Sequence, residues 1–351
     1  MKQKVYIDKM KRIKKLSTPA RFLSYSAVGG YEEKRGPLGT NFDFCDDTDR
    51  FGQNTWEMSE GEMGRCALNI ALTKAHISHD ALGLIVAGDL QNQCVASSVG
   101  LDSFGVPFLG IYGACSTCTE ALLILSSMIE SGTVKTGACL TTSHNSAAER
   151  QFRSPLEYGG QRSPAAQWTS TAAGSFILTA DSTIQGYSES TAAISDFMIG
   201  KIVDGATSDG SNMGAAMAFA AAQSIIDYFA ESELKPRDFD HIVTGDLGRV
   251  GTDILRAILN DRLPSAAPRH LDCGLLLYDN KHKDVHSGAS GCGTSASVLA
   301  SFFLPKIETG ELGNILFLST GALMSPSSLL QGNNIKGIAP VIHIKRLEGE
   351  S

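Results

Sequence analysis

The chain carries an internal duplication. Segment 79–90, HDALGLIVAGDL, returns at 237–247 as RDFDHIVTGDL, an apolar run of strand type that stops at Gly-Asp-Leu. Each copy follows a helical stretch with Met-Gly near its start. Segment 113–143 returns at 290–321, and both copies read as a small-residue turn, an apolar helix, Glu-x-Gly and a buried strand ending in Ser or Thr. Four elements in the same order, at offsets of about 150 to 180 residues, indicate duplication rather than chance.

Each half reads as helix, strand, helix, strand, which predicts an α/β fold in which helices cover a parallel sheet. The two halves are expected to pack as pseudo-twofold mates, with a basic arm at 1–20, an N-terminal half at 21–181 and a C-terminal half at 182–351. Ligands of such sheets gather at the carboxyl ends of the strands. Those ends are the segments GDLQNQ, GACST, SHN, GDLGRVG, GASGCG and STGALM.

The charge pattern excludes general attraction to nucleic acid, because the formal net charge is −7. Basic residues concentrate only in the arm, where seven of the first fifteen residues are Lys or Arg. The arm lacks an apolar core for a signal peptide, and no window offers the roughly 20 apolar residues of a membrane span. We therefore expect a protein made in the cytoplasm without a membrane span. The arm is read as a solvated tail, with contact to an anionic membrane as the alternative.

The eight cysteines are scattered, and only Cys115 and Cys118 have a motif spacing, so free thiols are expected. A Cys-x-x-Cys redox pair lacks support because no proline lies between the two cysteines and nothing else suggests a redox fold. Four zinc ligands at suitable spacing are not evident. We expect no cofactor.

Cys115 follows a Gly-Ala turn and opens an apolar helix. Backbone N–H groups and the helix dipole at such a position lower the pKa of a thiol, which favours a nucleophile. The alternative is a small buried residue at a tight corner. The residues alone leave both interpretations open.

A duplicated α/β chain with this cysteine resembles the thiolase and ketosynthase superfamily. TAAGSFILTA (171–180) is similar to the superfamily's strand at the end of the first half, and HSGASG (286–291) to its histidine-glycine turn. The resemblance implies a thiolase-like fold of duplicated αβαβα layers. A narrower match runs from about Leu38 onwards and leaves the basic first twenty residues outside. This narrower match resembles the stage V sporulation protein AD family. Its segments are GPLG, NTWEMSE, AGDLQNQ, GACST, SHNSAAERQFRSPLEYGGQR, TGDLGRVG, the Asp-Cys-Gly of LDCGLLLYD, SGCG and STGALMSP.

That resemblance implies a non-enzymatic protein that binds dipicolinic acid, as the acid or as its calcium chelate, and supports its uptake into the developing spore. It also implies a homodimer that works with other proteins of the same sporulation operon, peripherally at the spore inner membrane. The alternative is an active thiolase or ketosynthase-type acyltransferase that uses Cys115 and His286.

The catalytic set that the superfamily would require is incomplete here. Ketosynthase-like enzymes place a histidine where this chain has Gly245 or Asp246, and Asp246 close to Cys115 would raise the pKa of the thiol. His286 matches the thiolase histidine, so it either pairs with Cys115 or is exposed in a polar loop. Cys292 lies near the position of a second basic cysteine, in a different sequence setting. We expect no catalysis, with residual acyl transfer left open.

Dipicolinate is a flat dianion, which calls for guanidinium or helix N-terminal amide groups and an apolar slot. SHNSAAERQFRSPLEYGGQR follows a buried strand and offers such groups, although its arginines suit a dimer interface equally well. Asp89 and Asp246 are read as caps of the helices that follow, with calcium binding as the alternative for Asp246. The predicted ligand-binding residues are Cys115, Asn92, His144, Asn145, Arg150, Asp246 and His286; further candidates are Gln93, Glu149, Arg153, Tyr158, Gln161 and Arg162.

Overall fold

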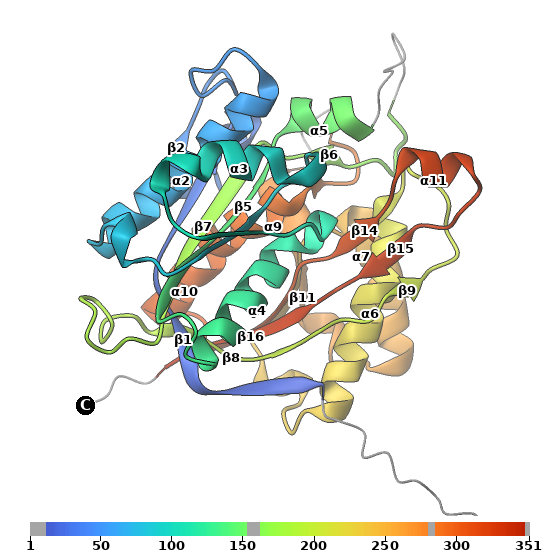
Figure 1. Cartoon of the computed structure of the whole chain (residues 1–351). Coiled ribbons are helices and arrows are strands. Elements are labelled where there is room, and N and C mark those ends of the chain that lie inside the picture. Colours follow the sequence, from blue (N-terminus) through green and yellow to red (C-terminus); the bar gives the residue numbers. More distant parts are fainter. Residues whose placement is uncertain (1–11, 153–161, 280–284, 348–351) are drawn as a thin grey trace, which may run out of the picture.

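The computed structural model describes residues 12–152, 162–279 and 285–347 (Figure 1). The first half contains the strands β1 (Ile13–Gly29), β2 (Phe44–Cys45), β3 (Ile85–Gly88), β4 (Phe108–Gly110), β5 (Thr136–Ser143), β6 (Trp168–Thr169) and β7 (Ala172–Thr179). Its helices are α1 (Tyr31–Arg35), α2 (Trp56–Ala75), α3 (Val95–Leu101), α4 (Thr117–Glu130) and α5 (Asn145–Phe152).

The second half repeats this plan. Its strands are β8 (Ala192–Met198), β9 (Val203–Asp204), β10 (His241–Thr244), β11 (His270–Asp272), β12 (Ala289–Ser290), β13 (Asn314–Leu318), β14 (Gly321–Leu323), β15 (Lys336–Ile338) and β16 (Val341–Arg346). Its helices are α6 (Met213–Glu231), α7 (Gly248–Arg262), α8 (Cys273–Leu277), α9 (Cys292–Val298), α10 (Leu304–Thr309) and α11 (Pro326–Leu330).

The strand order proves the duplication. In the main sheet the order is β11-β10-β13-β16-β8-β1-β7-β5-β3-β4. Counted within each half, both halves therefore order their five strands 3-2-4-5-1, and in both the fifth strand, β7 or β16, runs antiparallel to its neighbours. Antiparallel pairing of β1 with β8 joins the halves. The helix-strand-helix-strand pattern expected for each half was thus incomplete, since it omitted the first and third strands of both halves and the fifth strand of the second half; TAAGSFILTA had indicated β7.

The helices form three layers around the two halves of the sheet (Figure 1). α2 packs on one outer face, α6 on the other, and α4 and α9 lie between the halves. β5 shows why both faces must be apolar: Cys139 faces the central core and Leu140 the outer core under α2, as the alternation of side chains along a strand requires. The predicted architecture of duplicated αβαβα layers is confirmed.

Glycines allow the outer helices to approach one another closely in both halves. A methyl group at Gly100 of α3 would lie 2.2 Å from the carbonyl oxygen of Gly61 in α2, and one at Gly251 of α7 would lie 2.6 Å from that of Gly214 in α6. Gly61 is therefore the structural equivalent of Gly214, whereas the repeated Met-Gly pattern had aligned Gly64 with Gly214.

The predicted basic arm at 1–20 overlaps the fold. β1 begins at Ile13, which pairs with Met198 of β8. Ile13 and Leu16 pack on the core, while the lysines between them are exposed, and this is why the segment reads as a solvated tail. The boundary between residues 181 and 182 falls in the connection from β7 to β8. Within the described ranges, no helix has the length and apolar character needed to cross a membrane.

Candidate functional site

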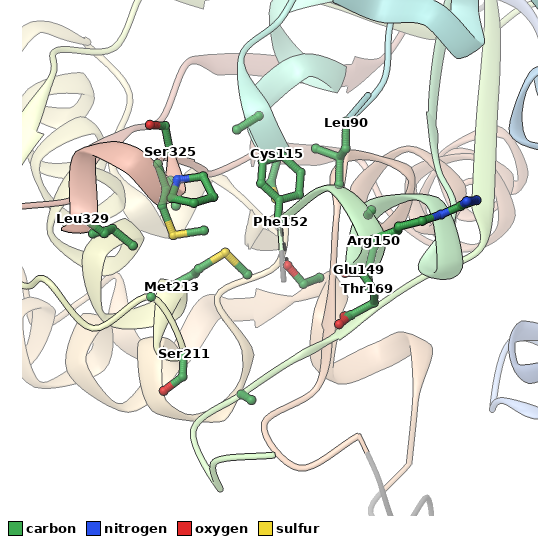
Figure 2. Close-up of a pocket in the computed structure, with 18 of the residues that line it drawn as sticks. Leu90, Cys115, Glu149, Arg150, Phe152, Thr169, Ser211, Met213, Ser325 and Leu329 are labelled. Carbon is green, nitrogen blue, oxygen red and sulfur yellow. Dashed lines mark hydrogen bonds between the residues drawn. The ribbon is translucent and has the colours of Figure 1, made fainter. Parts of the chain in front are cut away.

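A pocket of about 1360 Å³ opens where the carboxyl ends of strands from both halves meet (Figure 2). Five of the six predicted strand-end segments contribute lining residues, and GDLGRVG lies behind the wall. The first half supplies Trp56, Leu90, Tyr112, Ala114, Cys115, Asn145, Ser146, Ala148, Glu149, Arg150, Phe152, Arg162, Ser163, Ala166 and Thr169. The second half supplies Gly210, Ser211, Met213, Ser290 and most residues from Ala322 to Leu330.

Cys115 lies at the floor of the pocket in a tight turn ahead of α4. Ala114 before it has a φ of 52°, an unfavourable value for a residue with a side chain. Hydroxyl groups hold this turn: Thr117 Oγ1 donates to the carbonyl of Ala114 at 2.7 Å, and Ser116 Oγ donates to that of Gly113 at 2.6 Å. The Ser/Thr-rich sequence after the cysteine therefore fixes the direction of its side chain.

The second half closes the floor from the opposite side. Ser290 Oγ lies 3.9 Å from Cys115 Sγ, and a methyl group at Gly321 would lie 2.5 Å from the carbonyl oxygen of Gly113. Thr119 Oγ1 donates to Ser319 Oγ at 2.9 Å beneath them. The two turns that the repeat relates, GACST and SGCG, thus meet across the pocket as predicted.

Asp246 is fully buried immediately behind this floor. Its Oδ2 accepts hydrogen bonds from Gly291 N at 2.9 Å and Ser290 Oγ at 3.1 Å, and its Oδ1 accepts one from Thr320 Oγ1 at 3.0 Å. Burial raises the pKa of Asp246 to about 6. Because the protein already supplies three donors, Asp246 acts as a structural acceptor and is not oriented towards a ligand in the pocket.

The pKa of the Cys115 thiol is raised well above its ordinary value, first by burial and then by the charge of Asp246. The charge of Asp246 therefore has the effect on the thiol that the sequence analysis expected. Only the thiolate is a good nucleophile, so a raised pKa leaves Cys115 as a neutral thiol near pH 7.

We expect Asp246→Asn to lower the pKa of the Cys115 thiol, because it removes the charge that disfavours the thiolate. Alkylation of Cys115 by iodoacetamide at fixed pH should accelerate about tenfold, which corresponds to a pKa change of about one. Peptide mass spectrometry measures the rate, with Cys66 of the same sample as the internal reference. An unchanged rate at Cys115 would show that burial alone sets the pKa.

The structure does not bring His286 to Cys115. His286 has a φ of 46° and an exposed side chain, and it lies outside the pocket. The next residue turns inward, where Ser287 N donates to the carbonyl of Ala166 at 3.0 Å. Cys292 is fully buried and its Sγ donates to the carbonyl of Thr142 at 2.9 Å. The predicted binding role of His286 is therefore not supported by its position.

The predicted capping roles of the two aspartates have different outcomes. Asp89 binds the first turn of α3, accepting from Ser97 N at 2.8 Å. Asp246 does not cap α7, so that prediction was wrong. The buried carboxylate of Asp272 takes this role and accepts from Leu247 N at 2.8 Å and Gly248 N at 3.0 Å.

Two predicted arginines line the wall of the pocket, each beside a carboxylate. Arg150 on α5 lies 3.0 Å from Glu57 and is mostly exposed. Arg162 lies 3.1 Å from the buried Glu149 and stacks on Trp168 with 4.8 Å to the ring centroid. Figure 2 shows Glu149 and Arg150 on α5 beside the cavity. The cationic groups that a dianion requires are present in the wall, but they are paired.

The remaining predicted binding residues divide between the wall and the layer behind it. Asn145 lines the pocket, and its Nδ2 donates to the carbonyl of Thr169 at 3.0 Å. His144 is fully buried outside the lining; its Nε2 donates to the carbonyl of Asp49 at 2.9 Å, and burial lowers its pKa. Asn92 is exposed outside the pocket, and its Oδ1 accepts from Gln151 Nε2 at 3.3 Å. These contacts make His144 and Asn92 supports of α5.

The sequence analysis missed much of the apolar wall. Tyr112, Phe152, Met213 and Leu329 line the pocket, and Figure 2 shows Met213 and Leu329 together on the side opposite Arg150. A signal existed for some of them, since Met213 belongs to the repeated Met-Gly pair and STGALMSP leads into α11. Gln93 is exposed, and the candidates Arg153, Tyr158 and Gln161 lie outside the described residues.

The cysteines bear out the expectation of free thiols. All eight fall within the described ranges and none is in a disulfide. Cys118 packs into the central core, whereas Cys115 packs into the core under α6. Burial raises the pKa of Cys118 to about 12. The two thiols of the Cys-x-x-Cys spacing therefore pack against different sets of side chains.

Comparison with solved structures identifies other proteins of the same fold. A histidine-to-aspartate variant of Xanthomonas campestris OleA is 14% identical with a TM-score of 0.59, covering 95% of this chain and 100% of that one. The 3-oxoacyl-[acyl-carrier-protein] synthase III of Aquifex aeolicus VF5 is 14% identical with a TM-score of 0.57, covering 93% and 99%.

Comparison of sequences gives a narrower result. The family model for stage V sporulation protein AD matches residues 10–345, so the match begins well before Leu38 and includes residues 10–20, which the sequence analysis had left outside. Stage V sporulation protein AD of Bacillus subtilis (strain 168) is 38% identical over 328 residues, which cover 93% of this chain and 95% of that protein. The chain therefore belongs to the stage V sporulation protein AD family and has a thiolase-like fold.

Proposed function

We propose that this sporulation protein binds dipicolinate without turnover and supports its uptake into the developing spore. The observation that carries the proposal is the pocket itself: guanidinium groups stand beside apolar side chains in its wall, above a thiol that is kept protonated. This arrangement suits a flat ring with two carboxylates better than it suits acyl transfer.

The wall suggests how the ligand binds. The aromatic ring of dipicolinate would lie against Phe152 and Leu90, with its carboxylates at Arg162 and Arg150. The free dianion must then compete with Glu149 and Glu57 for these arginines. A calcium chelate is neutral and would leave both ion pairs in place. Binding of the free dianion would therefore break these ion pairs, whereas binding of the chelate would not.

Absence of catalysis is part of the proposal. A thiolase-like reaction needs a thiolate and a base, whereas Cys115 is a neutral thiol and, in the described residues, the pocket lining contains no imidazole. The competing acyltransferase function makes a clear prediction. Incubation with acetyl-CoA would produce an acetyl adduct on Cys115, detectable by intact mass, at a catalytic rate.

Calorimetric titration with dipicolinate, with and without calcium, tests the proposed function. We expect saturable binding that Cys115→Ala weakens about tenfold, since the side chain lines the floor of the pocket, and that the matched variant Cys66→Ala leaves unchanged. Absence of binding in both conditions, or rapid acetylation of Cys115, would refute the proposal.

We further propose that two copies pair through β4. This strand ends the main sheet in the described part, and its residues are exposed, including Phe108 and Leu109. Tyr112, Val95 and Val99 extend the apolar surface beside it. An exposed strand edge with apolar side chains is a template for pairing with another chain. Antiparallel pairing of β4 with β4 of a second copy would satisfy the backbone hydrogen-bonding groups of both strand edges in a twofold dimer.

Leu109→Asp should convert the dimer to a monomer, because it places two carboxylates beside the twofold axis. Sedimentation velocity measures the change, with Leu330→Asp, a substitution at an exposed leucine on α11, as the control. A protein that is monomeric before substitution would contradict the proposed pairing. Other proteins of the same sporulation operon at the spore inner membrane are the proposed partners of the dimer.

A further inference from the structure

The pocket offers no net positive charge to a dianion. Its described lining contains three charged side chains, Glu149, Arg150 and Arg162. Glu149 pairs with Arg162, and Glu57 pairs with Arg150. Free dipicolinate would therefore bring two negative charges into a site whose cationic groups are already balanced. Because a charge taken out of water needs a partner or neutralisation, binding of the free dianion requires positive charge from another source.

One buried carboxyl stands directly behind the floor of this pocket. Asp246 is fully buried, and Ser290, which lines the pocket, donates its hydroxyl to Asp246 Oδ2 at 3.1 Å. The charge of Asp246 also helps to raise the pKa of Cys115, another lining residue. An anion that enters the pocket repels this carboxylate, and the repulsion favours the protonated carboxyl.

The hydrogen bonds of Asp246 show which oxygen can accept a proton. Oδ2 accepts from the backbone N–H of Gly291 at 2.9 Å, and an N–H group cannot become an acceptor. Oδ1 lies 3.0 Å from Thr320 Oγ1, and a hydroxyl can accept as well as donate. A proton on Oδ1 therefore has a hydrogen-bond acceptor in Thr320, and the amide contact of Oδ2 stays in place.

The segments packed around Asp246 do not supply a buried cation. No Lys or Arg side chain is buried in the described part of the chain. Burial lowers the pKa of His270 to about 3, so its imidazole is neutral near pH 7. The titratable groups on these segments are acids, this neutral histidine and basic residues that are not buried; they are Cys115, Asp272, Cys273, Cys292, His270, Arg162, Arg249 and His286.

Two further buried carboxyls, Asp89 and Glu60, lie beside Leu90 of the wall but are less suited to take up a proton. Both oxygens of Asp89 are held by backbone N–H groups, those of Gln91 at 2.9 Å and Ser97 at 2.8 Å. Burial and the charge of Asp89 raise the pKa of Glu60 to about 8, so this carboxyl already holds its proton near pH 7. Asp246 is thus the carboxyl behind the pocket that can change its charge when the ligand enters.

We propose that binding of free dipicolinate draws one proton from solution onto Asp246 Oδ1. The inference rests on the proposed function and adds proton uptake to it. The proton comes from the buffer, and no bond of the ligand breaks. Burial already raises the pKa of Asp246 to about 6, so repulsion by the dianion carries it through neutral pH. The calcium chelate is neutral and should draw no proton.

Calorimetric titration with dipicolinate near pH 7, in Pipes and in Tris, counts the protons because the two buffers differ in their enthalpy of ionisation. The unchanged protein should take up about one proton per dipicolinate, and its affinity should fall by up to about tenfold per pH unit between about pH 6 and 8. The heat of binding of the calcium chelate should be the same in both buffers.

Three variants identify the group that accepts the proton. Asp246→Asn should bind dipicolinate without proton uptake, because its amide can donate to Thr320 and its oxygen can accept from Gly291. Asp272→Asn and Glu149→Gln remove the two other buried carboxyls that could titrate, and proton uptake should persist in both. If Asp246→Asn does not bind, uptake by the unchanged protein that both other variants retain supports the assignment.

Three results would overturn the proposal: equal heats in the two buffers for free dipicolinate, uptake that Asp246→Asn retains, or binding of the calcium chelate alone. In each of these cases the ligand still binds, so the proposed function stands and only the proton is rejected. Absence of binding with and without calcium would reject the proposed function and the proton uptake together.

Discussion

Arg162→Gln should weaken dipicolinate binding about tenfold to a hundredfold, and Glu149→Gln should strengthen it. A charge-assisted hydrogen bond contributes about 1.5–3 kcal/mol, and each 1.4 kcal/mol changes an affinity about tenfold. Arg162 lines the pocket but pairs with Glu149 at 3.1 Å. Removing the carboxylate frees the guanidinium for a dianionic ligand, whereas removing the guanidinium leaves the ligand without its counter-charge.

The double variant Arg162→Gln/Glu149→Gln is the control, because it removes both charges of the ion pair together. It should bind as weakly as Arg162→Gln. Calorimetry with calcium distinguishes the form of the ligand: if the neutral chelate is bound, Glu149→Gln weakens binding or has no effect. Equal affinities for all three variants and the unchanged protein would place the ligand away from this wall.

Asp272→Ala should lower the free energy of unfolding by about 4 kcal/mol. The Asp272 carboxylate is buried and accepts hydrogen bonds from two amides at the start of α7, Leu247 N and Gly248 N, and from Thr244 Oγ1 at 2.7 Å. Each buried amide left without an acceptor costs about 1–3 kcal/mol. Urea denaturation followed by tryptophan fluorescence measures the change.

Asp240→Ala is a matched control, because Asp240 also accepts from two backbone amides, those of Gly313 and Asn314, but is exposed. Water replaces its carboxylate, so the loss should stay below about 1 kcal/mol. Similar losses for Asp240→Ala and Asp272→Ala would contradict burial as the reason for the large effect.

The same carboxyl makes stability depend on pH. Burial raises the pKa of Asp272 from 3.8 to about 7, so the folded protein holds the proton more tightly than the unfolded chain between these values. Linkage then makes its contribution greatest at low pH and lost as the pH rises towards 7. Asp272→Asn, which cannot titrate, should flatten that part of the stability curve.

Local patterns predicted the parts of the fold that depend on neighbours in sequence. Apolar runs such as 79–90 identified β3 and β10, and the repeat placed Cys115 opposite Ser290. β1 was partly missed because Lys14 and Lys15 are exposed on a strand whose Ile13 and Leu16 are not, which reads as a charged tail. β4 was missed because three residues with exposed side chains show no periodicity.

The candidate site was predicted in outline. Arg150 and Asn145 were expected to line the pocket and do so, whereas His144 lies one layer behind it. His286 has an exposed side chain outside the pocket and a φ of 46°, in the left-handed region. No pattern in the sequence reports such an angle at a non-glycine residue.

The sequence by itself determined the duplication, the layered α/β fold, the free thiols and the pocket at the strand ends, because each follows from periodicity or from spacing along the chain. The tertiary structure decided which side chains form hydrogen bonds and ion pairs with one another. Asp272, and not Asp246, caps α7; Asp246 instead raises the pKa of Cys115, and Glu149 neutralises Arg162. These pairings depend on distances of a few ångströms between segments far apart in the sequence, and only the packed chain sets those distances.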